Sequence, residues 1–226
     1  MGATKMIREE QQRRSKWKQL KHDFIDFPLY VMGHPFKGFD DIKLEGEGKT
    51  SVGVTILVVQ AFVAVLNFVY RGFIANMADP YDLNVLLILA TSIAPVLLFC
   101  IGNWSITTLM DGSGTIREIF LALTYSMYLA IPLNLVSIVL SNVLVEEEMA
   151  VATFFSTLAM VIFLLYAFIG LIVVHDFTFL RAIAAVLLSF VAILIILFLA
   201  MLLASLAGEV ILFFRTIYRE IVLNYT

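Results

Sequence analysis

The chain carries few side chains whose types and spacing could support catalysis or hold a metal ion. One adjacent acid–base pair, His175-Asp176, follows an apolar run. A hydrolytic triad would need a Ser or Cys nucleophile beside this pair, and the sequence places none there. The remaining histidines, His22 and His34, are far from His175 and show no metal-ligand spacing. The pair is therefore predicted to form a turn.

Three further motifs could suggest chemistry, and each has a simpler structural interpretation. Gly112-Ser113-Gly114 is too short for a phosphate-binding loop and has no lysine partner. Glu146-Glu147-Glu148 would point in different directions on a helix, so we interpret it as helix-start charge rather than a cation site. Cys100 has apolar neighbours and is predicted to be buried, and a single cysteine excludes an internal disulfide or a Cys-based metal site. We therefore expect no catalytic residue, no metal and no cofactor, and a protein that is not an enzyme.

The composition places the chain in the membrane. Of its 226 residues, 61% are hydrophobic and 15% are charged. A water-soluble domain of this size could not bury so much apolar surface. The predicted fold class is an all-α, polytopic integral membrane protein.

Five apolar runs are long enough to cross a bilayer, which requires about 20 residues. Pro95 in the second run and Pro132 in the third predict kinks. The fifth run is longer than a bilayer requires, so Glu209 is predicted to mark the headgroup level and residues 215–226 to form an interfacial segment. The five predicted transmembrane helices cover residues 51–70, 84–104, 118–140, 149–174 and 181–214.

Two segments precede the first span. Residues 1–26 are predicted to form a basic cytoplasmic tail, and residues 27–50 an aromatic, amphipathic segment. The second segment is expected to be extended and then to form a short helix over residues 38–44 on the membrane surface. Phe36, Phe39 and Ile42 would form the apolar side of that helix.

The basic tail allows two interpretations. It could be a flexible or loosely helical solvated segment, as charged segments commonly are. It could instead lie against anionic lipid. Nothing else in the sequence supports nucleic-acid binding, so no nucleic-acid partner is expected. The lipid-facing candidates in the tail are Arg13, Arg14, Lys16 and Lys18.

The distribution of Lys and Arg predicts the orientation. Ten of the fifteen basic residues precede the first span. A cytoplasmic N-terminus places twelve of the fifteen inside and three outside, as the positive-inside rule requires. Five crossings then place the C-terminus and Glu146–Glu148 outside, and the His175 turn inside.

Residues 103–114 form the most polar interruption between the spans. Trp104 has the amphipathic ring that prefers the headgroup level. Asp111 and the glycines that follow it are typical turn residues. A short, ordered cytoplasmic loop is therefore predicted over residues 103–114.

This loop and residues 34–43 also carry a family resemblance. The segments read NWSITTLMDGSG and HPFKGFDDIK, and the similarity continues through 141–144 and 216–222. Over roughly residues 30–226 the chain resembles bacterial members of the Yip (Ypt-interacting protein) domain family. The resemblance implies five membrane helices, a cytoplasmic N-terminus and a multi-pass protein of the bacterial cell (plasma) membrane.

The resemblance also implies a function. Bacterial relatives are often encoded beside ABC-type carbohydrate importers, which implies a non-enzymatic accessory subunit that packs against the importer's permease subunits. Eukaryotic relatives bind small GTPases in vesicle traffic, but their Asp-Leu-Tyr-Gly-Pro signature has no counterpart here. The candidate residues for a partner surface are Phe36, Phe39, Asn103, Trp104, Thr107, Met110 and Asp111.

Two other functions remain open. The protein could organise the membrane, acting on lipid or on a GTPase partner, or it could form a small permeation pathway. A pathway would need polar or charged groups at mid-membrane. Asn67 and Asn134 are the amides in the spans, and we interpret them as helix–helix hydrogen bonders. Small residues such as Ala167, Gly170 and those at 204–208 would allow helices to approach closely.

Overall fold

The computed structural model describes residues 16–73 and 84–224, and the described residues form helices without any strand. Five helical segments are long and apolar enough to cross a membrane, which confirms the predicted fold class. The protein is therefore a multi-pass, all-α membrane protein. The five segments are Thr50–Tyr70, Val85–Leu109, Ile116–Val143, Glu146–His175 and Phe179–Glu220.

The segment before the first span is helical, so the predicted extended chain from residue 27 is wrong. A π-helical turn, η1 (His22–Asp26), leads into α2 (Phe27–Gly33), and α3 (Pro35–Asp40) leads into a second π-helical turn, η2 (Asp41–Glu45). Pro28 and Pro35 lie in the first turns of α2 and α3, where proline costs no hydrogen bond. The short helix expected over residues 38–44 is thus divided between α3 and η2.

Helix α4 (Thr50–Tyr70) matches the first predicted span, and α5 (Val85–Leu109) extends beyond the second. The hydroxyls of Ser105, Thr107 and Thr108 each donate to the carbonyl four residues earlier. Because these polar groups are satisfied within the helix, α5 continues through most of the predicted loop, and only residues 110–115 remain to connect it to α6. The turn predicted at residues 77–82 lies outside the described residues.

The third span is broken into two helices, α6 (Ile116–Ser126) and α7 (Ala130–Val143). Pro132 lies in the first turn of α7, where its missing N–H and its ring oppose continuation of the preceding helix. The sequence predicted a kink, and the structure has a turn at residues 127–129. Helix α6 begins with a capping box, in which Thr115 and Glu118 satisfy each other's backbone N–H groups.

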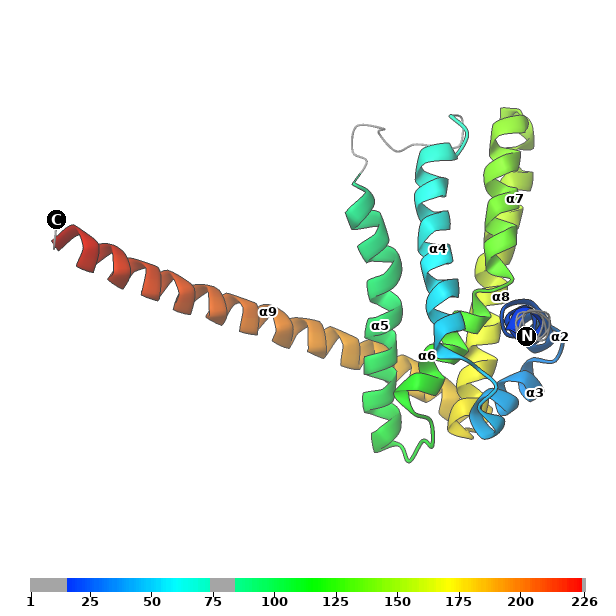
Figure 1. The fold of residues 1–226 in the computed structure, drawn as a ribbon, viewed down its shortest axis with the longest axis horizontal. Helices are drawn as coiled ribbons and strands as arrows, with labels where there is room; N and C mark the ends of the chain where they lie inside the picture. The colour runs from blue at the N-terminus through cyan, green and yellow to red at the C-terminus, as the bar shows by residue number, and fades with distance from the viewer. Residues whose placement is uncertain (1–15, 74–83, 225–226) are drawn as a thin grey trace, which may run out of the picture.

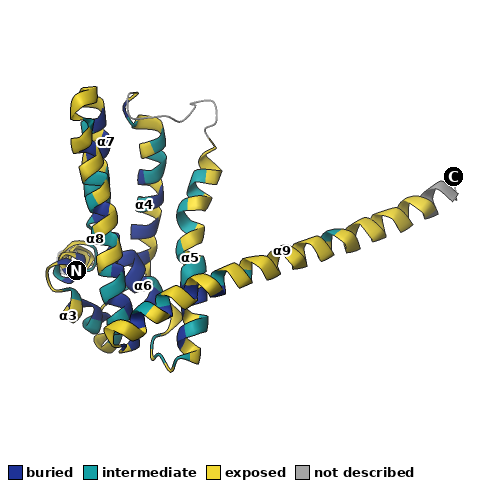
Figure 2. Ribbon diagram, turned by 180° about the vertical axis from the view of Figure 1, so that it is seen from behind, coloured by how far each residue is buried: buried dark blue, intermediate teal, exposed yellow. Residues whose placement is uncertain are grey.

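Helix α6 lies in the centre of the core. Its side chains Ile119, Leu121 and Tyr125 are fully buried, and the buried residues gather at its end of the bundle (Figure 2). Helix α8 (Met149–His175) packs against α6 and α7. A short 3-10 turn, η4 (Glu146–Glu148), precedes α8, so the three glutamates lie at a helix start, as predicted.

Helix α9 (Phe179–Asn224) leaves the bundle at a steep angle (Figure 1). Its 46 residues form one helix about 69 Å long, well beyond the roughly 30 Å of a bilayer's hydrocarbon core. An apolar helix that exceeds the bilayer thickness tilts to keep its side chains in lipid. The structure has no break at residue 214, where an interfacial segment was predicted to begin.

Only the first part of α9 packs on the bundle. Gly102 of α5 lies against Ser189 and Ile193, so closely that a Cβ atom would be 2.6 Å from Ile193 Cγ1. Beyond Ile193, exposed apolar side chains cover the helix (Figure 2). Helix α9 therefore has a short docked part and a long part that extends away from the bundle (Figure 1).

Candidate functional site

Polar side chains from five parts of the chain meet at one end of the bundle, and we call this cluster the polar junction. The contributing parts are the turn η2, the last turns of α5, the α5–α6 connection, the end of α8 with the turn that follows it, and the first turns of α9. Its members are Lys43, Asn103, Thr107, Ser113, His175, Asp176, Arg181 and Ser189.

The inner half of the polar junction is a buried hydrogen-bond chain that joins three membrane helices. Asn103, His175 and Ser189 are 1%, 2% and 0% exposed. Asn103 Nδ2 donates to Ser189 Oγ at 3.0 Å, and the Ser189 hydroxyl donates to the Ala185 carbonyl. Asn103 Oδ1 then accepts from His175 Nε2 at 3.0 Å, which assigns the Nε2–H tautomer. These hydrogen bonds connect α8 and α9 to the same residue of α5, Asn103.

Two glycines of the α5–α6 connection allow it to lie directly on the His175 ring. A Cβ atom on Gly112 would be 2.9 Å from His175 Nδ1, and one on Gly114 would be 2.5 Å from Val174 Cγ1. The His175 ring also stacks on Phe177, with 5.2 Å between ring centroids. His175 is thus enclosed, and its Nδ1 is buried without a hydrogen-bond partner.

The outer half of the polar junction is an ion pair between η2 and the α8–α9 turn. Lys43 Nζ donates to Asp176 and, at 2.9 Å, to Ser113 Oγ, while the Ser113 hydroxyl lies 3.0 Å from Asp176 Oδ2. The hydrogen bond from Lys43 is the main cause that holds the pKa of Asp176 below its ordinary value; partial burial opposes it and Ser113 adds to it. Asp176 has φ 54° and caps the C-terminus of α8, which confirms the predicted turn.

Arg181 fastens the same end of the bundle from α9. Its guanidinium donates to the carbonyl of Met110 in the α5–α6 connection. It also lies 4.7 Å from the ring centroid of Phe177, a favourable cation–π arrangement. The connection is therefore held from both α8 and α9.

The geometry indicates that the polar junction joins helices and connections rather than carrying out catalysis. The hydrogen bonds of the His175 ring reach Asn103 alone, and Asp176 faces Lys43 and Ser113 rather than the histidine. A nucleophile–base–acid relay needs those groups in one line, and the described residues do not provide it. The described residues also contain no group of three His, Cys, Asp or Glu side chains that could hold a metal ion.

The structure divides the predicted partner-surface residues into two sets. Phe36, Trp104 and Asp111 are exposed. Phe39, Asn103 and Thr107 are buried inside the protein, and Met110 packs against the small apolar cluster that contains Phe177, so these four have internal partners. In the tail, Lys16 and Lys18 are exposed on a helical segment, whereas Arg13 and Arg14 lie outside the described residues.

Sequence reasoning missed Lys43, Ser113 and Ser189 as members of the polar junction. Lys43 and Ser113 lie 70 residues apart, and a pairing over such a separation leaves no local pattern. Ser189 had a signal, because it is a single hydroxyl inside a long apolar run and such groups commonly join helices in lipid.

The small residues singled out in the fourth span do mediate close helix packing. A Cβ atom on Gly170 would lie 3.0 Å from Ala122 Cβ of α6 and 3.2 Å from Phe39 Cζ of α3. Ala167, one turn earlier, is buried in the same core. This face of α8 therefore contacts both α3 and α6, which agrees with the predicted close approach of helices at these small residues.

Comparisons with known proteins give one family. Searches of curated proteins and of solved structures found no match. The family profile of the Yip1 domain matches residues 29–201. This match spans the pre-membrane helices, the first four spans, the polar junction and the docked part of α9. The chain therefore belongs to the Yip1 domain family of membrane proteins.

Proposed function

We propose that the protein is a non-enzymatic membrane scaffold that binds transmembrane helices of a partner through the free part of α9. The observation that carries this proposal is the environment of Gly208. A Cβ atom added to Gly208 would meet nothing within 4 Å, although the residue lies in the longest apolar helix.

The other described glycines inside the spans lie where two helices pack closely together. Gly53, Gly102 and Gly170 each face a neighbouring helix, with contacts of 2.6 to 3.0 Å to an added Cβ. Glycine in a membrane helix allows this close approach, and it costs helix stability where nothing uses it. Gly208 is the one described span glycine whose packing surface is unoccupied, which supports an intermolecular partner.

Gly208 continues a face of small residues. Ala200 and Ala204 precede it at intervals of four residues, so the three lie on one side of α9. Repeated small residues at this spacing let two helices approach closely in lipid. Leu202 and Leu206 lie on the opposite side, where they would face lipid.

The proposed partner is the permease part of an ABC-type carbohydrate importer in the bacterial plasma membrane. The resemblance to bacterial Yip-domain proteins supports this choice. The small-residue face on α9 suits lateral packing against permease helices, and the exposed Phe36, Trp104 and Asp111 would add contacts at the cytoplasmic end.

Co-purification from native membranes in a mild detergent tests the proposal. The wild-type chain is expected to retain importer permease and ATPase subunits, identified by mass spectrometry. The double variant Ala204→Leu, Gly208→Leu places bulk on the small-residue face, so the permease should be lost while the variant itself remains folded and monodisperse.

The matched control is Leu202→Phe, Leu206→Phe, which adds bulk to the opposite face of the same turns and should retain the permease. If no importer subunit accompanies the wild-type chain, the importer assignment is wrong. If a membrane partner is retained equally by both variants, the small-residue face is not the docking surface.

A further inference from the structure

The bundle contains a cavity that neither the polar junction nor the proposed scaffold role uses. It has a volume of about 670 Å³, within the range of small-molecule sites. It lies between α4, α5, the α6–α7 turn and α8, and the docked part of α9 closes one end with Val186 and Phe190. Met160, Leu164 and Phe190 are 62%, 52% and 55% exposed, so the cavity opens sideways, toward the lipid.

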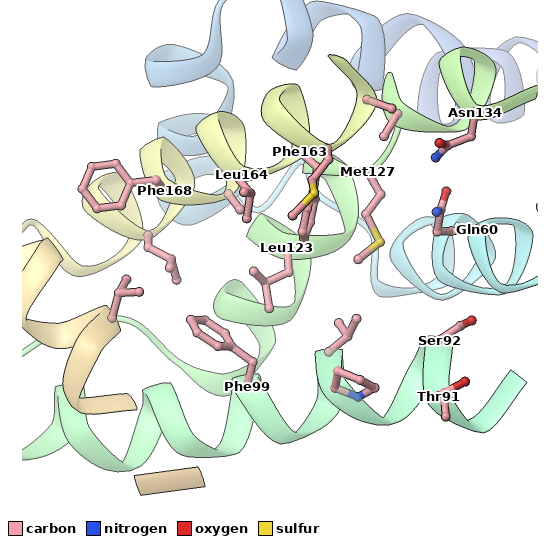
Figure 3. A pocket seen from close by; sticks show the side chains of 18 of the residues that line it. Gln60, Thr91, Ser92, Phe99, Leu123, Met127, Asn134, Phe163, Leu164 and Phe168 are labelled. Atoms are coloured by element: carbon pink, nitrogen blue, oxygen red, sulfur yellow. The ribbon is translucent and has the colours of Figure 1, made fainter. Parts of the chain in front are cut away.

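The lining is polar at one end and apolar at the other. Gln60, Thr91, Ser92 and Asn134 lie together at one end, and Phe99 and Phe168 lie toward the other (Figure 3). The lining residues along α8 run from Ser156 to Leu171, about 22 Å at 1.5 Å per residue. That length exceeds one leaflet, half of the roughly 30 Å hydrocarbon core. The cavity therefore matches an elongated molecule with a polar head.

The polar end holds an unused hydrogen-bond acceptor. Gln60 Oε1 is buried without a hydrogen-bond partner. The neighbouring hydroxyls cannot supply one, because Thr91 and Ser92 donate to the carbonyls of Leu87 and Ile88 in their own helix. An amide oxygen in this position is stabilised by a ligand that donates a hydrogen bond.

The charge of the lining restricts the ligand further. Gln60 is at the middle of α4, and among the described residues the cavity is lined by no Asp, Glu, Lys, Arg or His. A carboxylate, a phosphate or an ammonium group would be unpaired here at mid-membrane depth, which is costly. The head of the ligand is therefore neutral.

We propose that this cavity binds a lipid alcohol, a single apolar chain whose terminal hydroxyl donates a hydrogen bond to Gln60 Oε1. The chain lies along α8 between Phe163 and Phe99 and enters from the bilayer between α5 and α8. The steep course of α9 keeps this entrance open, because a fifth helix parallel to α8 would cover it.

Photocrosslinking in lipid nanodiscs tests the proposal on the full-length protein. The probe is a diazirine-bearing hexadecanol, and mapping after chymotryptic digestion should find it on α8 peptides around Ala159 and Ala167; trypsin is unsuitable because residues 118–180 contain no Lys or Arg. Unlabelled hexadecanol should compete, whereas hexadecyl methyl ether, which accepts but cannot donate a hydrogen bond, and palmitate should compete poorly.

Three variants give the residue-level result. Gln60→Leu should reduce capture by about fivefold, the change expected when one neutral hydrogen bond is lost. Val96→Phe, which fills the cavity from α5, should abolish capture. Asn67→Leu removes an exposed amide from the same helix outside the cavity and should leave capture unchanged.

Size-exclusion profiles and helical circular dichroism verify that each variant is folded. Capture that is equal in the Gln60→Leu variant, or equal competition by the ether or by palmitate, would overturn the proposed head-group contact. Crosslinks spread over the lipid-facing sides of all helices, or no capture above an empty nanodisc, would show that the cavity holds water or phospholipid chains only.

Discussion

At the scale of single residues, the fold depends on a few polar groups placed where lipid or apolar core surrounds them. Asn103 is the clearest case, because each end of its amide has one partner, Ser189 and His175. Away from water, such groups are costly to leave unpaired. The polar stretch that was predicted to be a cytoplasmic loop is therefore largely a helix end that joins other helices.

Asn103→Leu should destabilise the protein more than its size change implies. The substitution removes the acceptor of the buried His175 Nε2–H, and a buried unsatisfied group costs about 1–3 kcal/mol. The Ser189 hydroxyl loses one bond but keeps its bond to the Ala185 carbonyl. The expected outcome is a clearly lowered thermal unfolding midpoint in detergent. Thr108→Val is the matched control on the same helix, since the Thr108 hydroxyl is exposed and bonds only within α5, and its midpoint should stay near that of wild type. Equal midpoints for the two variants would contradict this role of Asn103.

Some residues of the polar junction could be predicted from the sequence, and others could not. The His175-Asp176 turn was predictable because the pair ends a long apolar run. The partners of the turn were not, since Lys43 reaches Asp176 across 133 residues. Asn103 and Thr107 looked like surface residues because polarity alone does not distinguish an exposed loop from a buried helix contact.

At the scale of elements, the first and fourth spans were predicted almost to the residue, because long apolar runs with turn residues at both ends leave little choice. The break between α6 and α7 was predicted only as a kink, since Pro132 indicates disruption but does not fix where the preceding helix stops. Extended chain was predicted where α2 forms, because proline usually indicates non-helical backbone. Pro28 is compatible with a helix here because it lies in the first turn of α2. The direction of α9 depends on tertiary packing and has no local sequence signal.

The contact between Gly102 of α5 and the first part of α9 can be tested by substitution. Gly102→Val should destabilise the protein by about 1–3 kcal/mol, the usual range for overpacking, because its Cβ would lie 3.1 Å from the Ser189 carbonyl oxygen as well as against Ile193. Thermal unfolding of the purified chain measures this. Gly208→Val makes the same substitution in the free part of α9, where an added Cβ atom would meet nothing within 4 Å. This variant should have a much smaller effect on stability. The reverse order of effects would mean that α9 docks through its distal half instead.

At the scale of the whole molecule, three basic residues at or beside the connections, Lys43, Arg117 and Arg181, gather at one end of the bundle, whereas Arg71 lies at the other end, where it follows α4 (Figure 1). Arg117 donates to the Gly48 carbonyl at 2.7 Å, Lys43 contacts Ser113, and Arg181 contacts Met110. The acidic η4 turn joins α7 to α8 at the opposite end of the bundle (Figure 1). The orientation predicted from the Lys and Arg counts would place the polar junction on the cytoplasmic side, and it stays a prediction.

Cysteine accessibility in intact cells tests this topology most directly. In a Cys100→Ala background, single cysteines replace Asp111 in the α5–α6 connection, Glu147 in η4 and Arg219 near the end of α9, all of which are exposed. A membrane-impermeant maleimide should label the Glu147→Cys and Arg219→Cys variants in intact cells, and the Asp111→Cys variant only after permeabilisation. If Arg219→Cys instead behaves like Asp111→Cys, α9 does not cross the membrane, and a five-span protein with its ends on opposite sides is contradicted.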